Sequence, residues 1–115
     1  MRQRIGDKQR LEHIVEASDD LCSFLLELDY RAFVADKRTM FAAIRAIEII
    51  GEASRHVSDE LKQHHPEADW RAATAMRNFV IHQYFDVDVL SLWKTATEQV
   101  PVYRAQIALI LSSLL

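Results

Sequence analysis

Residues 37–57, KRTMFAAIRAIEIIGEASRHV, decide the fold class of this chain. Apolar side chains recur there at steps of three and four, which is the spacing of one helix face. The predicted buried face consists of Met40, Ile44, Ile47, Ile50, Ser54 and Val57, with Arg45, Glu48, Glu52 and Arg55 away from it. Asp36 precedes the stretch and can accept hydrogen bonds from its first free backbone amides. We therefore predict a capped helix over 37–57. Gly51 costs this helix about 1 kcal/mol relative to alanine, so we expect a neighbouring helix packed closely against it.

The same periodicity continues on both sides of this stretch. From Asp7 onward the apolar face is Leu11, Ile14, Ser18, Leu21, Leu25 and Leu28, which predicts a first helix followed by a break over 29–36. A short helix is expected from Ser58 to His64-His65, where Pro66 stops it because proline lacks the amide hydrogen. Asp69 is expected to cap a further helix that begins at Trp70 and turns Ala73, Met76 and Val80 inward.

The C-terminal quarter predicts one more long helical stretch. Its stripe is Val89, Trp93, Ala96, Val100, Tyr103, Ile107, Ile110 and Leu114, and it is unbroken across Pro101. This pattern predicts either one helix kinked at Pro101 or two helices stacked end to end. The apolar tail around Leu109 leaves two alternatives open, packing against the first helix or a subunit interface.

Composition agrees with an all-α chain. The chain has 115 residues, of which 50% are hydrophobic and 27% charged, with only 2 Gly and 2 Pro. Turn-rich β folds and disorder are both disfavoured by these values. We predict one domain over residues 1–115, an antiparallel helical bundle of four main helices plus a short extra helix.

Charge, cysteine count and hydropathy exclude several classes of protein. A net charge of −3 argues against a protein that coats nucleic acid with a uniformly basic surface, although a local basic cleft is compatible with it. The single cysteine, Cys22, forms no intrachain disulfide and is expected to be a packed core thiol. No segment reaches the roughly 20 apolar residues that span a bilayer, so we expect a soluble, cytoplasmic protein.

Residues 76–84, MRNFVIHQY, are the one segment that concentrates polar chemistry in apolar sequence. Asn78 and His82 are four apart and share a helix face, whereas Arg77 and His82 diverge by about 140° on a straight helix. They converge on one substrate atom only if the helix loosens near His82, or if a second copy faces the first across a two-fold axis. The plainer alternative is that these are ordinary residues near a helix end, with Arg77 reaching solvent.

Arg77-Asn78-x-x-x-His82-x-Tyr84 resembles the R-x4-H-x-Y motif of HepT-like proteins in the HEPN superfamily. Further similar landmarks are Asp36-x-Arg38, residues 47–53, residues 58–61, His65-Pro66, Trp70-Arg71, residues 84–88 and Leu92-Trp93. The resemblance covers most of the chain from the first helix to Trp93. Phe79 and Gln83 depart from the family pattern, and both positions bear on substrate contact.

The resemblance implies a HEPN-like fold and a metal-independent endoribonuclease that acts as a toxin. It implies a homodimer with the two motifs in one cleft, and a minimal nucleotidyltransferase partner that serves as antitoxin by adenylylating Tyr84. In this reading the substrate is RNA, with tRNA as a candidate, and no cofactor is needed.

Residue chemistry points the same way. Cleavage of RNA without a metal needs a group that takes the 2′-hydroxyl proton and one that stabilises charge on phosphorus, roles that suit His82 and Arg77. Asn78 can orient His82 or bind phosphate. His64 and His65 are better explained by favourable charge at a helix C-terminus, and no histidine pair has metal-ligand spacing, so no metal is predicted. The alternative from another class is a non-catalytic helical module that binds a nucleotide or docks the nucleotidyltransferase.

Overall fold

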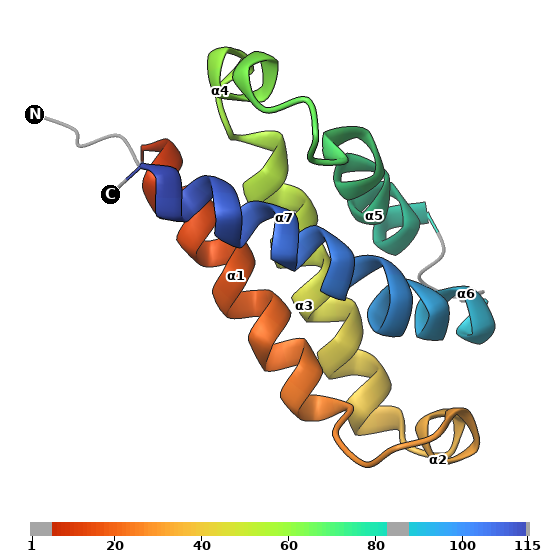
Figure 1. The fold of residues 1–115 in the computed structure, drawn as a ribbon. Coiled ribbons are helices and arrows are strands. Elements are labelled where there is room, and N and C mark those ends of the chain that lie inside the picture. Colours follow the sequence, from red (N-terminus) through yellow and green to blue (C-terminus); the bar gives the residue numbers. More distant parts are fainter. Residues whose placement is uncertain (1–5, 83–87, 115) are drawn as a thin grey trace, which may run out of the picture.

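The computed structural model describes the backbone of residues 6–82 and 88–114 and the side chains of 6–76 and 88–114 (Figure 1). The described elements are all helical: α1 (Asp7–Phe24), α2 (Tyr30–Val34), α3 (Lys37–Arg55), α4 (Asp59–His64), α5 (Trp70–His82), α6 (Val89–Lys94), the π-helical segment η1 (Thr95–Gln99) and α7 (Val100–Ser113). The predicted all-α fold is confirmed.

Three long helices form the centre of the bundle, and α5 packs on one side of it. α1 contacts both α3 and α7, and α3 also contacts α5. The start of α1 lies beside the end of α7, so these two helices are antiparallel (Figure 1). Their shared core includes Leu11 and Ile14 of α1, Ile47 and Ile50 of α3, and Ile107 of α7, all with no exposed surface. Each such side chain contributes about 1.5–3 kcal/mol when it leaves water.

α3 confirms the amphipathic pattern of residues 37–57, with small corrections. The Asp36 carboxylate accepts from the Thr39 amide at 3.2 Å, as a cap should. The helix ends at Arg55, short of the predicted Val57, and Met40 and Ile44 are only partly buried. The fully buried set is dominated by small residues and isoleucines: Ala43, Ala46, Ile47, Ile50, Gly51, Ala53 and Ser54. A buried Gly51 fits the close helix packing that the sequence predicted.

The break predicted over 29–36 contains a helix that the sequence did not suggest. α2 is capped by Asp29, whose carboxylate accepts from the Ala32 amide at 2.8 Å. Phe33 has no exposed surface and anchors this single turn to the bundle. The described chain therefore has two short extra helices, α2 and α4, where one was predicted. A five-residue helix is too short to show a helical period in its sequence. Its stability comes from tertiary packing, which the sequence pattern does not reveal.

The C-terminal stretch is one continuous helical run, as predicted. Its irregular turn lies before Pro101 and not at it. A π-helical segment, Thr95–Gln99, lies between α6 and α7, and Pro101 falls in the first turn of α7. Because proline has no amide hydrogen and clashes with the carbonyl four residues back, a wider turn just before it relieves the conflict. In α6 the fully buried residue is Leu92, whereas the predicted Trp93 and Val89 are only partly buried.

The prediction that Cys22 is a core thiol is wrong. Cys22 is exposed and lines a groove of about 380 Å³ between the end of α1 and the C-terminal helix. Ser18, Leu21 and Leu25 take the buried side of α1, and Cys22 lies about 100° around the helix from Leu21. The apolar tail divides: Ile107 and Ile110 are buried in the core, while Leu109 is 74% exposed. Packing of the tail is thus confirmed, and a subunit interface at Leu109 stays a prediction.

Candidate functional site

α5 carries the segment that the sequence singled out, and its start is firmly anchored. The Asp69 carboxylate accepts from the Ala72 amide at 3.1 Å, which confirms the predicted cap. The Trp70 indole donates to the carbonyl of His65 at 2.9 Å, and Ala73 and Met76 are buried as predicted. These contacts fix the rotation of α5 against α3 one turn before Arg77.

The backbone of α5 is α-helical from Trp70 to His82. Arg77, Asn78 and His82 therefore lie on a regular helix, but their side chains are outside the described residues, as is Tyr84 altogether. A helix without irregularity removes one of the two routes by which Arg77 and His82 could converge, because five positions on a regular helix remain about 140° apart. The roles of these four residues stay predictions.

A groove of about 340 Å³ runs between α5 and the C-terminal helix, lined by Asp69, Ala72, Met76, Glu98, Gln99, Val102, Tyr103 and Gln106. At its base the hydroxyls of Tyr103 and Ser54 lie 2.8 Å apart, and the Tyr103 ring meets Trp70 edge-on. Burial raises the pKa of Tyr103 to about 12, so its phenol is neutral. The described residues that line this groove include two carboxylates and no basic side chain, which disfavours phosphate there.

Three of the described histidines, His56, His64 and His65, are engaged in local hydrogen bonds. His64 Nδ1 lies 2.8 Å from the carbonyl of Glu60, and His65 Nδ1 lies 2.9 Å from a carboxylate oxygen of Glu67. His56 Nε2 lies 3.0 Å from Glu52. Across residues 6–76 and 88–114, no group of three His, Cys, Asp or Glu side chains could hold a metal ion. Metal independence of the chemistry nevertheless stays a prediction.

The structure brings together one further set of residues that the sequence analysis missed, at the α2–α6 end of the bundle. The ring centroids of Tyr30 and Trp93 are 6.1 Å apart, and those of Phe33 and Trp93 are 5.1 Å apart. Each outer ring is followed in sequence by a cation, Arg31 and Lys94. The pairs Tyr30-Arg31 and Trp93-Lys94 are the signal that could have pointed to this cluster, although only the fold shows that they meet.

None of the described helices is both long enough and apolar enough to cross a membrane.

The described chain is an all-helical bundle, and its helix α5 includes Arg77 and His82 of the segment that the sequence singled out. Comparison with known proteins gives the family: the family model described as "Ribonuclease HepT-like" matches residues 14–110. This chain belongs to the HepT-like ribonuclease family, which confirms the resemblance found in the sequence.

Individual relatives agree over nearly the whole chain. The chain is 48% identical over 99 residues to "Probable ribonuclease HepT" of Thermococcus cleftensis, covering 86% of this chain and 90% of the relative. It is 36% identical over 103 residues to "Putative RNase MJ1380" of Methanocaldococcus jannaschii, covering 90% of this chain and 94% of the relative. "Putative RNase TTE0752" of Caldanaerobacter subterraneus is 33% identical over 105 residues, covering 88% of this chain and 90% of the relative. No solved structure matches the chain significantly.

Proposed function

We propose that this chain is a metal-independent endoribonuclease, the toxin of a toxin–antitoxin pair, which cleaves RNA such as tRNA in a cleft between two copies of itself. Membership of the HepT-like ribonuclease family over residues 14–110 supports the reaction class. The observation that carries the site is the sequence motif Arg77-x4-His82-x-Tyr84, of which Arg77 and His82 fall within α5.

The proposed reaction is attack of the ribose 2′-oxygen on the adjacent phosphorus, with departure of the 5′-oxygen. His82 takes the 2′-hydroxyl proton as general base, and the leaving 5′-oxygen takes up a proton from the imidazolium so formed or from water. Arg77 offers its guanidinium donors to the phosphoryl oxygens as charge develops on them. Asn78, one turn before His82, orients the imidazole or binds phosphate. The products are a 2′,3′-cyclic phosphate and a 5′-hydroxyl.

The regularity of α5 supports a cleft shared by two copies. Since the backbone of α5 is regular up to His82, positions 77 and 82 lie about 140° apart around the helix. A two-fold axis beside α5 would bring Arg77 of one copy next to His82 of the other.

The reaction is tested by incubating the purified protein with bulk tRNA in EDTA and analysing fragment ends. We expect fragments that end in 2′,3′-cyclic phosphate from the wild type and none from His82→Ala or Arg77→Ala. Both variants should keep the helical circular dichroism and the oligomeric state of the wild type. Loss of folding in either variant would instead make that residue structural, and loss of wild-type cleavage in EDTA would show that a metal is needed.

The shared cleft is tested by mixing the two inactive variants. In a heterodimer of Arg77→Ala with His82→Ala, one of the two sites regains an intact arginine and an intact histidine. Random exchange should therefore restore roughly a quarter of wild-type activity. If each copy contains its own complete site, no mixture regains activity.

Tyr84 is proposed as the regulatory residue, adenylylated by a minimal nucleotidyltransferase antitoxin. An added adenylate would place a negatively charged phosphate near the arginine that should meet the substrate phosphate. Intact mass after co-expression with the partner tests this: wild type should gain adenylate mass and Tyr84→Phe should not. Tyr84→Phe should also still cleave RNA and resist neutralisation.

The second candidate function is a non-catalytic docking module for a nucleotidyltransferase, which the net charge of −3 favours. It predicts nucleotidyltransferase binding without cleavage of any RNA.

A further inference from the structure

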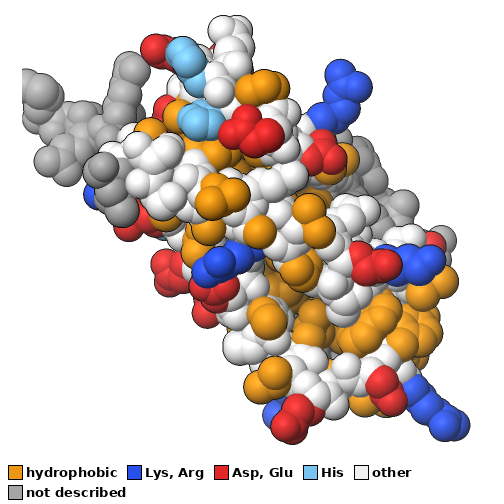
Figure 2. All heavy atoms as spheres, in the orientation of Figure 1, with side chains coloured by type: hydrophobic (Ala, Val, Ile, Leu, Met, Phe, Trp, Pro, Cys, Tyr) orange, Lys and Arg blue, Asp and Glu red, His pale blue; other side chains and the backbone are white. Residues whose placement is uncertain are grey.

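The α2–α6 end of the bundle presents an aromatic surface that the proposed chemistry does not use. Phe33 is fully buried and supports Trp93, whose ring it meets at 45°. Tyr30 packs edge-on against the same tryptophan at 61° and is itself 39% exposed. Figure 2 shows the resulting apolar patch over this end of the molecule. The arrangement holds an exposed ring in place without covering its outer face.

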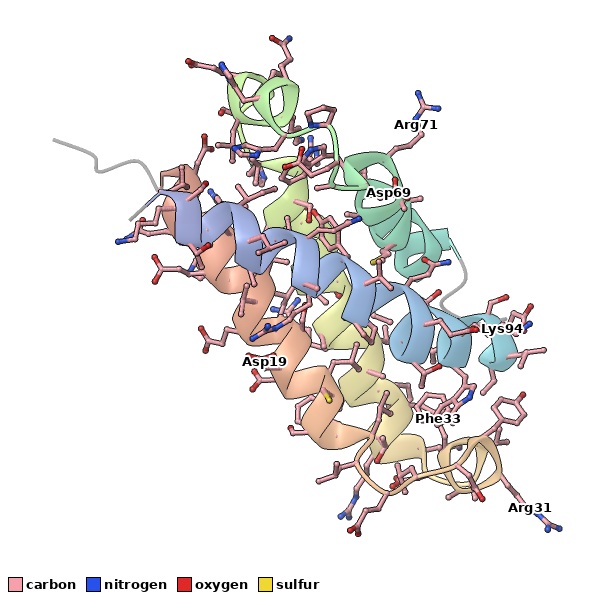
Figure 3. All side chains as sticks on the ribbon, viewed as in Figure 1. Asp19, Arg31, Phe33, Asp69, Arg71 and Lys94 are labelled. Carbon is pink, nitrogen blue, oxygen red and sulfur yellow. The ribbon has the colours of Figure 1, made fainter. Side chains whose placement is uncertain are left out.

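Cations surround this aromatic surface, and none of them is neutralised by an ion pair with a described residue. Arg31 and Lys94 follow the two outer rings in sequence and extend from α2 and α6 on either side of Phe33 (Figure 3). Lys37 and Arg38 are exposed on the adjacent first turn of α3. We call Tyr30, Trp93, Arg31 and Lys94 the aromatic–basic surface.

The acidic residues of this region cap the starts of helices. Asp29, Asp36 and Asp88 each accept a backbone amide at the start of a helix, from Ala32, Thr39 and Ser91 respectively. A carboxylate in that position interacts favourably with the positive end of the helix dipole. These three carboxylates keep their negative charge, and those of Asp36 and Asp88 interact with Arg38 and Lys94. Four cations thus stand against three carboxylates, so this end is less acidic than the whole chain.

The aromatic–basic surface also lies close to the candidate site along the chain. α5 ends at His82 and α6 begins at Val89, a step that spans at most about 25 Å when fully extended. Trp93 is one helical turn further on, about 6 Å along α6. A strand of RNA cut at His82 is thus within reach of this surface.

We propose that the aromatic–basic surface binds the single-stranded RNA that flanks the cleaved bond, with a base stacked on Tyr30 and phosphates held by Arg31 and Lys94. This inference rests on the proposed ribonuclease function. An exposed ring beside unpaired cations is the combination that single-stranded nucleic acid requires, since every base has a face to stack and every nucleotide a phosphate. Tyr, Trp and Arg are also enriched in protein interfaces, so a second copy of the chain is the competing occupant that the test must separate.

The test uses binding to a fluorescein-labelled, 2′-O-methylated single-stranded RNA, which lacks the attacking hydroxyl and so reports binding without cleavage. Anisotropy is measured over a range of salt concentrations. Arg31→Gln/Lys94→Gln should weaken binding and reduce the slope of log affinity against log salt by about 1.4, the value for two lost phosphate contacts on a single strand. Tyr30→Leu should weaken binding at least about five-fold with little change in slope.

A matched control removes two cations elsewhere. Lys62→Gln/Arg71→Gln makes the same change in net charge on α4 and α5, at the opposite end of the bundle (Figure 1). It should leave the affinity within about two-fold and the slope unchanged. Equal losses in both double variants would indicate only non-specific attraction and would overturn the proposal.

Two further readouts separate this proposal from the others. If RNA binding is unaffected in the Arg31, Lys94 and Tyr30 variants while His82→Ala abolishes cleavage, the surface is wrong and the proposed function stands. If binding depends on the surface but the wild type cleaves no RNA, the surface stands and the ribonuclease proposal fails. If Tyr30→Leu turns a dimer into a monomer by light scattering, the occupant is a second copy and the RNA proposal is overturned.

Discussion

α3 and the C-terminal helix both line the same core, yet they meet it in different ways. α3 stays α-helical over its 19 residues and buries small residues between its isoleucines. The C-terminal helix changes to π-helical geometry for Thr95–Gln99 and then returns to α-helical geometry at Val100. An amphipathic pattern thus predicts that a helix exists, but not that its turns are uniform.

The spacing of buried residues in the C-terminal helix fits its wider turn. In the C-terminal helix Leu92, Ala96 and Val100 are buried at two successive steps of four. Four residues of an α-helix overshoot a full turn by about 40°, so two such steps would swing the third side chain about 80° off the core. A wider turn keeps all three facing inward. α3 also buries Ala46, Ile50 and Ser54 at two steps of four and stays α-helical. Pro101 in the first turn of α7 has no counterpart in α3, and it is the feature that distinguishes the two helices.

The largest expected effect is the loss of stability when a buried isoleucine is truncated. It tests whether α3 and the C-terminal helix contribute equally to the core. Ile47→Ala in α3 and Ile107→Ala in α7 each remove a side chain with no exposed surface. Each should lower the free energy of unfolding by about 2–5 kcal/mol, measured by urea denaturation. Leu109→Ala, at a residue 74% exposed, is the control and should cost under about 0.5 kcal/mol. A cost below 1 kcal/mol at Ile107 alone would mean that the C-terminal helix is only loosely attached.

A smaller effect should appear at alkaline pH. The folded pKa of Tyr103 is raised to about 12, so the unfolded chain releases this proton first, near pH 10. Stability is fully present below pH 10 and is lost as the pH rises towards 12, by up to about 3 kcal/mol. Tyr103→Phe should lose less stability over this range. Parallel curves for the two proteins would show that burial does not perturb Tyr103.

The Ser54–Tyr103 contact joins the two helices and should respond asymmetrically to mutation at neutral pH. Ser54→Ala leaves the Tyr103 hydroxyl buried without this partner and should cost about 1–3 kcal/mol. Tyr103→Phe should cost about 0.5–1.5 kcal/mol, because the Ser54 hydroxyl still donates to the Ile50 carbonyl at 2.7 Å. Urea denaturation of both single variants and the double variant gives the coupling. Zero coupling would mean that the contact contributes nothing to helix docking.

The smallest effect concerns the caps that begin α3 and α6. Hydrogen bonds from Thr39 lower the pKa of Asp36, and hydrogen bonds from Ser91 lower the pKa of Asp88. Because the folded pKa is depressed, each cap stabilises the protein above the unfolded pKa, near 4, and this contribution is lost as the pH falls through the folded pKa. Asp36→Asn and Asp88→Asn should each make unfolding less sensitive to pH below 4. An unchanged acid profile would contradict the role of that cap.

Local signals predicted from the sequence were confirmed where a helix encodes its own ends and faces. The Asp36 and Asp69 caps and the buried Ile47 and Ile50 depend only on neighbours within a turn or two. α2 and the exposure of Cys22 could not be predicted in this way. The first depends on Phe33 packing into the bundle, and the second on where α7 stops covering α1.

The candidate site also has a part that the local sequence predicts and a part that depends on tertiary packing. The motif of Arg77, His82 and Tyr84 is a local spacing and was available from the sequence. The meeting of Tyr30 with Trp93 was not, because it depends on α2 docking against α6, two elements far apart in the chain. Sequence spacing therefore predicted the candidate catalytic residues, and only the fold brought Tyr30 and Trp93 together.

The exposure of Cys22 makes the chain ready for spectroscopy without any mutation. It is the only cysteine of the sequence and opens into the groove beside α1. One nitroxide attached there labels each copy once, at a position away from α5. A symmetric pair of copies would then give a single sharp inter-spin distance in pulsed electron paramagnetic resonance, and that distance would change if RNA or an antitoxin altered the angle between them.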